Sequence, residues 1–386
     1  MKRLLSQLLL LSLILQLVGC WDRREINDLA IVTASGFDIQ GEDEYLITAQ
    51  APIPGAMGGT GGGGGGTSGG AMFYLDAGIG KSVRQANQDL QKRMARRLMF
   101  GHRRVVVFGE DLAKVGLRET LDVLTRTREA RLNTQLFIAK GKANEVLAAL
   151  PQLENLSSEA IREQGVNTYY LTLEDFLTDY QRTGDDPLLP VLQTVKNKAP
   201  NPELQEDQIE ISQFAVFKED KIAFMTDEKQ TVAATFLIEK MKGKTYSVEW
   251  ESGVVTDLLI KQQSKKMSYT IKDNMPVFQI TVNLKGNVLE DQKGLNFEER
   301  EAMEQLNKQI NKQVETEMNN LLDETLSKGI DTFGFGWLLH RRDREKWANE
   351  WKDSWRTLLP TLTYEVKVNS SIEFTGLVTE GIGIGE

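Results

Sequence analysis

The sequence contains very few of the residues that build disulfides, metal clusters and nucleophilic sites. Among 386 residues there is one cysteine, Cys20, and there are two histidines, His102 and His340. One cysteine excludes an intramolecular disulfide and a cysteine-based metal cluster. Each histidine stands directly before two arginines, and neither has a second histidine at helical ligand spacing. We therefore predict no metal site and interpret both histidines as surface or helix-terminal residues.

Catalytic signatures are also missing. The sequence has no Gly-x-Ser-x-Gly elbow, and no free cysteine remains if Cys20 is acylated. Carboxylates are plentiful, with 55 Asp and Glu, so a glycosidase-type pair stays possible, but no pair stands out. The prediction is a protein that is not an enzyme and has no cofactor.

Positively charged residues are fewer than negatively charged ones, with 46 Lys and Arg against 55 Asp and Glu. The formal net charge is −9, and it becomes −11 if Lys2 and Arg3 are removed with an N-terminal signal. An acidic chain without a basic stripe is a poor nucleic-acid binder. The same net charge would hold the body slightly away from anionic lipid headgroups, so we expect membrane association to come from a lipid and from partner proteins.

Long apolar runs are absent except at the N-terminus. Lys2 and Arg3 precede an uncharged run from Leu4 to Val18, which is about 22 Å of helix at 1.5 Å per residue. A bilayer core of about 30 Å needs about 20 residues, so this run is short for a span and suits the apolar core of a signal peptide. No later run approaches the length of a span, so we expect a water-exposed body outside the cytoplasm.

The apolar run ends in a cleavage and lipidation signal. Its last residues are Leu17, Val18 and Gly19, directly before Cys20. Small residues before the cut fit a peptidase cleft, and the Cys20 thiol can be alkylated by a diacylglyceryl group. We predict a signal peptide over residues 1–19 and a durable lipid tether on Cys20. The alternative is an uncleaved N-terminal anchor with an incidental cysteine.

The pattern after Cys20 predicts an N-terminal α/β domain over residues 20–190. Its predicted strands are residues 31–39, 45–50, 105–108 and 134–139, and its predicted helices are residues 82–98, 111–124 and 143–150, with further helices to about Tyr180. Residues 55–70 are dominated by glycine and predict a mobile loop. A phosphate-binding loop is the alternative, but no Lys-Ser or Lys-Thr and no helix follows the glycines.

Proline and polar residues between 183 and 202 predict a domain boundary. Beyond it we expect a small middle domain over residues 205–252, in which strands 209–217 and 221–225 pair as a hairpin. We expect a C-terminal domain of a sheet covered by two helices over residues 253–386, with strands over residues 254–262, 266–272 and 277–288. The C-terminal domain includes a predicted helix of about 30 residues, 297–327, with one apolar stripe. The predicted fold class is α+β (mixed α/β), with three domains whose antiparallel or mixed sheets are covered by helices.

Three tryptophans recur at every fourth residue near the C-terminus: Trp347, Trp351 and Trp355. This spacing places three indoles on one face of a helix. Such a row usually packs a helix on a sheet. The alternative is a surface for a partner or for the membrane interface, since an indole combines apolar area with a hydrogen-bond donor.

Three stretches together resemble a known family. The first runs from Gly19 to Ala30 and includes Trp21, Asp22, Arg23, Arg24 and Asp28; the second, residues 101–110, includes Gly101, His102 and Glu110; the third, residues 331–336, includes Asp331, Gly334 and Gly336. In this order along the chain they resemble the Ger(x)C lipoproteins, the C subunits of spore germinant receptors. The polyglycine segment departs from the family's pattern.

The resemblance implies three mixed α/β domains on the outer face of the spore inner membrane. It also implies assembly with an integral-membrane A-type subunit and a polytopic B-type subunit, in a complex that senses nutrients and triggers germination. The favoured hypothesis is thus a non-catalytic, lipid-anchored receptor subunit. A solute-binding lipoprotein that captures a nutrient itself, in a cleft between domains, is the alternative. A cell-envelope hydrolase would need a pocket of carboxylates with displaced pKa values.

Overall fold

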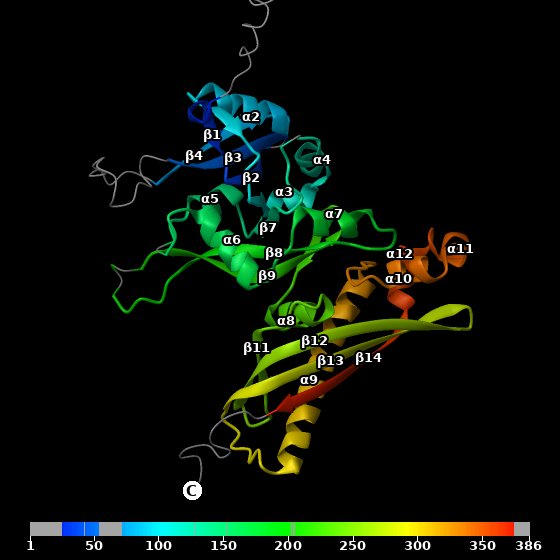
Figure 1. The fold of residues 1–386 in the computed structure, drawn as a ribbon. Coiled ribbons are helices and arrows are strands. Elements are labelled where there is room, and N and C mark those ends of the chain that lie inside the picture. Colours follow the sequence, from blue (N-terminus) through cyan, green and yellow to red (C-terminus); the bar gives the residue numbers. More distant parts are fainter. Residues whose placement is uncertain are drawn as a thin grey trace, which may run out of the picture.

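The computed structural model describes residues 25–373, apart from residues 42, 54–71, 128, 152, 202 and 204. It shows two units, each built on its own main sheet, one above the other in Figure 1. The predicted signal peptide, the residues from Cys20 to Arg24 and the glycine-rich segment 55–70 lie outside the described residues. The predictions made for them therefore stay predictions.

The upper unit contains an eight-stranded mixed sheet in the order β10-β9-β8-β7-β6-β2-β3-β4. Its central strands β8, β7, β6 and β2 run parallel, and the strands at both edges are antiparallel. The strands are β2 (Ala34–Gln40), β3 (Glu44–Pro52), β4 (Phe73–Gly80), β6 (Val105–Gly109), β7 (Gln135–Ala139), β8 (Leu188–Lys196), β9 (Asp207–Lys218) and β10 (Lys221–Met225). A separate parallel pair joins β1 (Leu29–Ile31) to β5 (Arg97–Met99).

Helices cover both faces of this sheet, which is why β6 and β7 are buried along their whole length. One face packs against α2 (Val83–Lys92), α3 (Glu110–Val115), α4 (Arg118–Arg126) and α7 (Leu173–Gln181). The other face packs against α5 (Ala143–Ala148) and α6 (Ser157–Asn167). The short helix η2 (Ile26–Asp28) precedes β1.

The lower unit has a four-stranded sheet in the order β11-β12-β13-β14. The strands are β11 (Lys244–Glu249), β12 (Val255–Lys272), β13 (Met275–Asp291) and β14 (Thr363–Glu373), and α8 (Glu228–Leu237) and α9 (Arg300–Ser327) pack on them. Figure 1 shows α9 lying along the sheet. The apolar stripe predicted for this helix is confirmed, because its residues form the core: Leu306, Ile310, Val314, Met318, Leu321 and Leu322.

Figure 1 shows a cluster of short helices at the upper end of α9, beside the upper unit. It consists of α10 (Phe335–Arg342), α11 (Arg344–Lys346), a π-helical turn η4 (Trp347–Trp351), α12 (Trp355–Leu358) and η5 (Leu359–Thr361). The α+β fold class predicted from the sequence is confirmed, since mixed sheets and helices build both units.

Three predicted elements were wrong in extent. The helix predicted for residues 82–98 ends at Lys92, and Arg97 belongs to strand β5, which is held by pairing with β1. The helix predicted for residues 111–124 is broken at Gly116, whose φ of +139° is incompatible with a helix. The two strands predicted between residues 254 and 272 form one strand, β12.

The strands predicted for a middle domain are shared between the two units. β9 and β10 pair in the eight-stranded sheet, and β9 lies directly beside β8. By contrast, α8 and β11 pack into the core of the lower unit. The polar segment 197–206 is the connection between β8 and β9 within one sheet, which a count of turn-forming residues cannot distinguish from a linker.

Candidate functional site: a polar junction between the two units

The residues singled out in the sequence fall in three places. Those from Leu17 to Arg24 are outside the described part of the chain, and Asp28 is exposed in η2. Gly101 and His102 form a turn before β6, with His102 exposed, and Glu110 begins α3 after the same strand. Only Asp331, Gly334 and Gly336 come together, and they do so where the lower unit meets the upper one.

Asp331 is the centre of this junction. It is 1% exposed, and its Oδ1 accepts hydrogen bonds from the backbone N–H groups of Gly334 at 3.0 Å and Phe335 at 2.9 Å. Its Oδ2 accepts from Gly336 N at 2.7 Å and Trp355 Nε1 at 3.0 Å. The carboxylate therefore satisfies the free N–H groups at the start of α10, where the helix dipole also favours a negative charge.

Two glycines let the backbones of the two units touch. Gly336, at the start of α10, faces Gly184, in the loop before β8. A Cβ on Gly336 would lie 2.8 Å from Gly184 O and 2.6 Å from Trp355 Nε1. Gly184 has φ +70°, and a Cβ there would lie 2.7 Å from the Trp347 ring. Any side chain at either position would push the units apart.

Asp186, in the upper unit, forms hydrogen bonds to the lower unit beside Asp331. It is 1% exposed, and its carboxylate accepts a bidentate pair of hydrogen bonds from Arg356, both at 2.9 Å. The carboxylate also accepts from Asp331 N at 2.9 Å and Glu219 N at 2.8 Å. Asp186 N in turn donates to Asp331 O at 2.8 Å. We call Asp186, Asp331 and Arg356 the junction triad.

The tryptophan row completes the junction from the lower side. Trp347, Trp351 and Trp355 are 2%, 2% and 3% exposed, so their expected place in the core is confirmed and the surface interpretation is wrong. The single helix expected for the row is not observed, because the row spans η4 and α12. The Trp347 and Trp355 rings meet edge to face with centroids 5.2 Å apart. Because the Trp355 indole also donates to Asp331, the row links the lower core to the triad.

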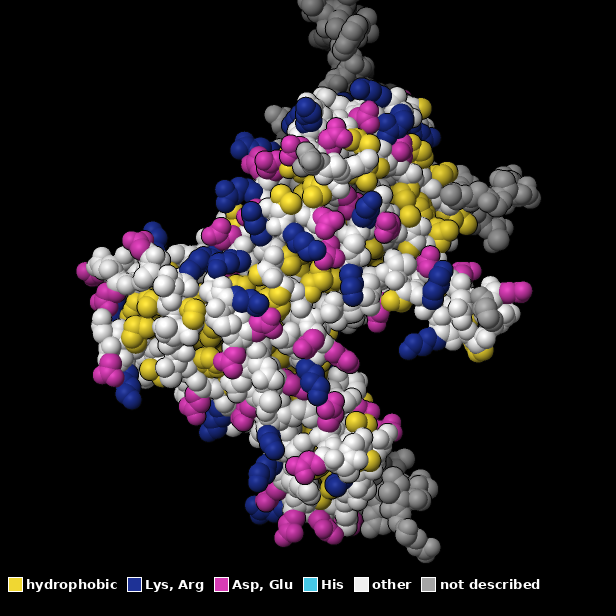
Figure 2. Space-filling view, turned by 180° about the vertical axis from the view of Figure 1, so that it is seen from behind, with side chains coloured by type: hydrophobic (Ala, Val, Ile, Leu, Met, Phe, Trp, Pro, Cys, Tyr) yellow, Lys and Arg dark blue, Asp and Glu magenta, His cyan; other side chains and the backbone are white. Residues whose placement is uncertain are grey.

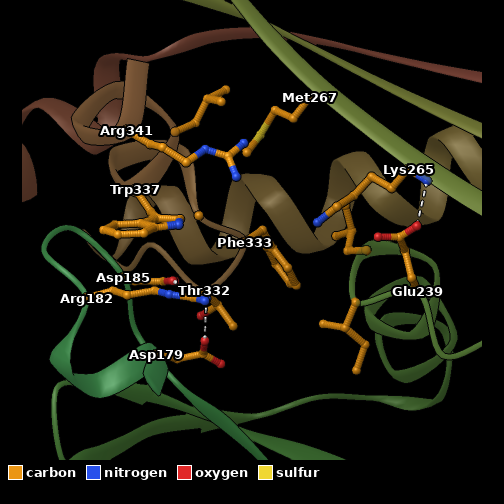
Figure 3. A pocket seen from close by; sticks show the side chains of 14 residues that line it. Asp179, Arg182, Asp185, Glu239, Lys265, Met267, Thr332, Phe333, Trp337 and Arg341 are labelled. Carbon is orange, nitrogen blue, oxygen red and sulfur yellow. Dashed lines mark hydrogen bonds and ion pairs between the residues drawn. The ribbon is translucent and has the colours of Figure 1, made fainter. Parts of the chain in front are cut away.

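A pocket of about 490 Å³ opens beside the triad, between the two units. Figure 3 shows Lys265 and Arg341 pointing into it on one side and Asp179, Arg182 and Asp185 on the other. Arg182 donates to Asp179 at 3.1 Å and lies 3.9 Å from Asp185. Its guanidinium also sits over the ring of Trp337, 5.2 Å from the centroid. The pocket is thus lined by side chains of both charges and by the aromatic rings of Trp337 and Phe333.

Burial changes the acidity of these carboxyls. It raises the pKa of Asp179 to about 6, against the lowering influence of Arg182. It also raises the pKa of Asp185, which neighbouring Asp331 raises further. Burial raises the pKa of Asp331 too, but four N–H donors occupy its two oxygens and favour the charged form. The N–H donors thus favour the ionised form of Asp331, whereas burial favours the protonated form of Asp185.

This arrangement predicts that the junction weakens as pH rises. A carboxyl whose pKa is raised on folding keeps a proton that the unfolded chain has lost, so stability falls as pH increases from about 4 through the raised pKa. We expect Asp185→Asn to melt at a higher temperature than the wild type at pH 8 and to lose that advantage at pH 4. Asp122→Asn, at an exposed position on α4, should show no such crossover; a parallel shift at both pH values in Asp185→Asn would contradict the prediction.

The pocket has carboxyls with displaced pKa values, as the hydrolase hypothesis requires. The room between them, however, is taken by Arg182, which is hydrogen-bonded to one carboxyl and close to the other. A general acid and base must face each other across the bond to be cleaved. In the described part of the chain, no group of three or more His, Cys, Asp and Glu residues is placed to hold a metal ion.

Sequence reasoning missed half of this junction. It noted the segment 183–187 only as a turn-rich boundary, and it did not single out Asp186 or Arg356. The usable signal was a Gly-Asp-Asp-Pro run directly before a buried strand, where carboxylates at a strand's start need partners. The partner itself lies 170 residues away in sequence, beyond the reach of any local pattern.

Comparison with known families covers both halves of the chain. Residues 22–194 match the spore germination protein N-terminal domain, and residues 212–376 match the spore germination B3/GerAC-like C-terminal domain. The chain belongs to the Ger(x)C family of germinant receptor C subunits. The first match ends within β8 and the second begins within β9, and the second includes every lower-unit residue of the junction.

Individual relatives agree with this assignment. Spore germination protein KC of Bacillus subtilis (strain 168) is 28% identical over 97% of this chain and 96% of its own length. Spore germination protein GerQC of Bacillus cereus is 23% identical over 94% of this chain and 98% of its own length. The crystal structure of the GerBC protein superimposes with a TM-score of 0.57 at 16% identity, covering 88% of this chain and 96% of that one. It shows that the fold is shared.

Proposed function

We propose that the protein is a non-catalytic, lipid-anchored subunit of a spore germinant receptor, required for nutrient-triggered germination through assembly with integral-membrane A-type and B-type subunits. The observation that carries this proposal is the position of the C-terminal family motif in the structure. Asp331, Gly334 and Gly336 build a buried joint between the two units, and the oxygens of Asp331 are all engaged by N–H donors. Residues arranged in this way hold parts together and leave no free group for chemistry.

The joint suits a subunit that passes on a conformational state. Backbone contact at Gly184 and Gly336, together with the bidentate Asp186–Arg356 pair, fixes the lower unit to the upper one. A force or displacement applied by a partner at one unit would therefore be carried to the other. Loss of a few contacts of the junction triad would uncouple the two units.

The tether is supplied by lipid on Cys20, on the outer face of the spore inner membrane. No helix in the described part of the chain has the length and apolar character of a bilayer span. A diacylglyceryl group holds a protein in the membrane plane and raises its effective concentration near membrane partners.

Replacing Cys20 by Ala is expected to release the chain from membranes. Fractionation of spore membranes after a high-salt wash measures this: the wild type should remain in the pellet, and Cys20→Ala should appear in the supernatant. Ser12→Ala, a change within the apolar run that leaves the cleavage site intact, is the matched control and should stay in the pellet. Retention of Cys20→Ala after the wash would mean that lipid is not the main tether.

The pocket between the units supports a second candidate, in which the subunit itself captures a nutrient. Its volume of about 490 Å³ and its cations facing carboxyls would suit a small polar solute. Calorimetry of the mature chain against a panel of amino acids and sugars separates the two proposals. We expect no saturable heat of binding. Tight binding that is abolished by Lys265→Met but kept in Lys308→Met, at a position on α9 far from the pocket, would favour direct nutrient capture.

A further inference from the structure

The far end of the upper unit carries an apolar groove that the junction does not use. It has a volume of about 530 Å³ and lies between η2, β1, the ends of β3 and β4, and the turn after α2. Its apolar lining includes Ile26, which is 77% exposed, and Ile53 and Tyr74, which are 38% and 36% exposed. Large side chains of this kind rarely stay in water without a purpose when they share one groove.

Arginines line one side of this groove although the chain is acidic. Arg93 and Arg96, in the turn after α2, line it, and Lys92 at the end of α2 and Arg97 at the start of β5 are exposed nearby, while the acidic Asp28 of η2 is exposed on the other side. Arg93 is engaged with Asp76 and Asp89, whereas Arg96 and Arg97 make no ion pair within the described chain. Figure 2 shows hydrophobic side chains exposed on the upper unit, with Lys and Arg interspersed among Asp and Glu.

The turn that carries the free arginines is held in place. The side chain of Gln91 donates to Arg96 O at 2.9 Å and accepts from Leu98 N at 2.9 Å. Parallel pairing of β5 with β1 then fixes Arg97 beside Leu29. Arg96, which lines the groove, and its neighbour Arg97 are thus held at a defined position.

The length of chain between Cys20 and Ile26 limits how far the groove can lie from the lipid-bearing residue. Ile26 is six residues after Cys20, and six extended residues span about 20 Å at most. If Cys20 carries the lipid, as the proposed function states, Ile26 stays within that distance of the lipid-bearing residue. The groove and its arginines are therefore kept within reach of the bilayer surface.

Resting on the proposed tether, we propose that this groove and its arginines form a docking surface for an anionic lipid bilayer. Ile26, Ile53 and Tyr74 enter the interfacial region, and Arg96 and Arg97 meet lipid phosphates. A cation near an anionic membrane surface gains attraction that falls off within a Debye length, so the two arginines act only in this orientation. Docking turns the upper unit's far end toward the bilayer and leaves the lower unit projecting away from it.

The orientation is tested on the full-length lipoprotein in vesicles of phosphatidylglycerol and phosphatidylcholine. Because Cys20 is the sole cysteine and is acylated, an added cysteine takes a fluorophore at one place. We expect a label on Ile26→Cys to be quenched by lipids with nitroxide on their acyl chains, and a label on Lys308→Cys, on α9, not to be. A chain that stays with the vesicles but shows no quenching at position 26 overturns the docking surface, whereas a chain that leaves the vesicles overturns the tether.

The charge contribution is tested without the lipid anchor. The Cys20→Ala chain, produced without its signal, is floated with the same vesicles. Arg96→Glu with Arg97→Glu should lower its partition coefficient at least about 30-fold, the effect of losing two cations near the surface. Lys308→Glu with Lys312→Glu makes the same charge change on α9 and should leave flotation unchanged. Equal loss in both double variants, or quenching at Ile26→Cys that needs an added membrane protein, would overturn the lipid assignment in favour of net charge or of a protein partner.

Discussion

Replacing Asp331 by Ala should lower the free energy of unfolding by about 3 kcal/mol or more, because it leaves buried N–H donors without an acceptor. Four donors lose their partner: three backbone groups at the start of α10 and the Trp355 indole. Since this carboxylate also orders the loop that meets Asp186, we expect the two units to unfold separately in the variant. Denaturant unfolding followed by tryptophan fluorescence measures both effects.

Asp227→Ala is the matched control for this change. Asp227 caps α8 by accepting a hydrogen bond from Gln230 N at 2.8 Å, in an exposed position. Its removal should cost about 1 kcal/mol and leave a single transition. If Asp331→Ala cost no more than Asp227→Ala, Asp331 would be an ordinary helix cap and the junction would not depend on it.

Replacing Asp186 by Ala is expected to lower the free energy of unfolding by about 3 kcal/mol, because it removes the acceptor of several hydrogen bonds at a buried position. The variant removes the acceptor of both Arg356 hydrogen bonds and of two backbone N–H groups, one on each side of the junction. Thermal or denaturant unfolding measures the loss. Limited proteolysis should in addition show cleavage between the units that the wild type resists.

A double-mutant cycle separates the coupling energy between Asp186 and Arg356 from the other contacts that each residue makes. Arg356→Ala alone should cost less than Asp186→Ala, because the arginine side chain is 37% exposed and Asp186 keeps its backbone donors. The double variant should cost less than the sum of the two single changes, since the pair is lost only once. Strict additivity would show that Asp186 and Arg356 act independently, contrary to the geometry.

The local parts of the fold could be predicted from the sequence. Alternating and periodic apolar residues predicted the hairpin of β9 and β10, the strands β6 and β7 and the helix α9, because burial of one face leaves a direct trace in the sequence. The ends of elements were less predictable. Gly116 ends a helix through its positive φ, and β5 exists only because β1 lies beside it.

The junction could be predicted only in part. Asp331, Gly334 and Gly336 were found through resemblance to a family, and their role as a helix-capping loop required the position of α10. Asp186 and Arg356 are 170 residues apart in sequence. They meet only because the loop before β8 in the upper unit lies against α12 of the lower unit. Likewise, the tryptophan row could be core or surface by its spacing alone, and burial in the lower unit decided between them.

The central claim is that this protein works as part of a membrane receptor. Co-purification from detergent-solubilised spore membranes, with a tag after Glu386, tests it most directly. The account predicts that the wild-type chain brings down a membrane protein with several spans, and that Asp331→Ala recovers less of it at equal yield of tagged chain. A wild-type chain that is purified alone, monodisperse and free of any membrane protein, would contradict the account.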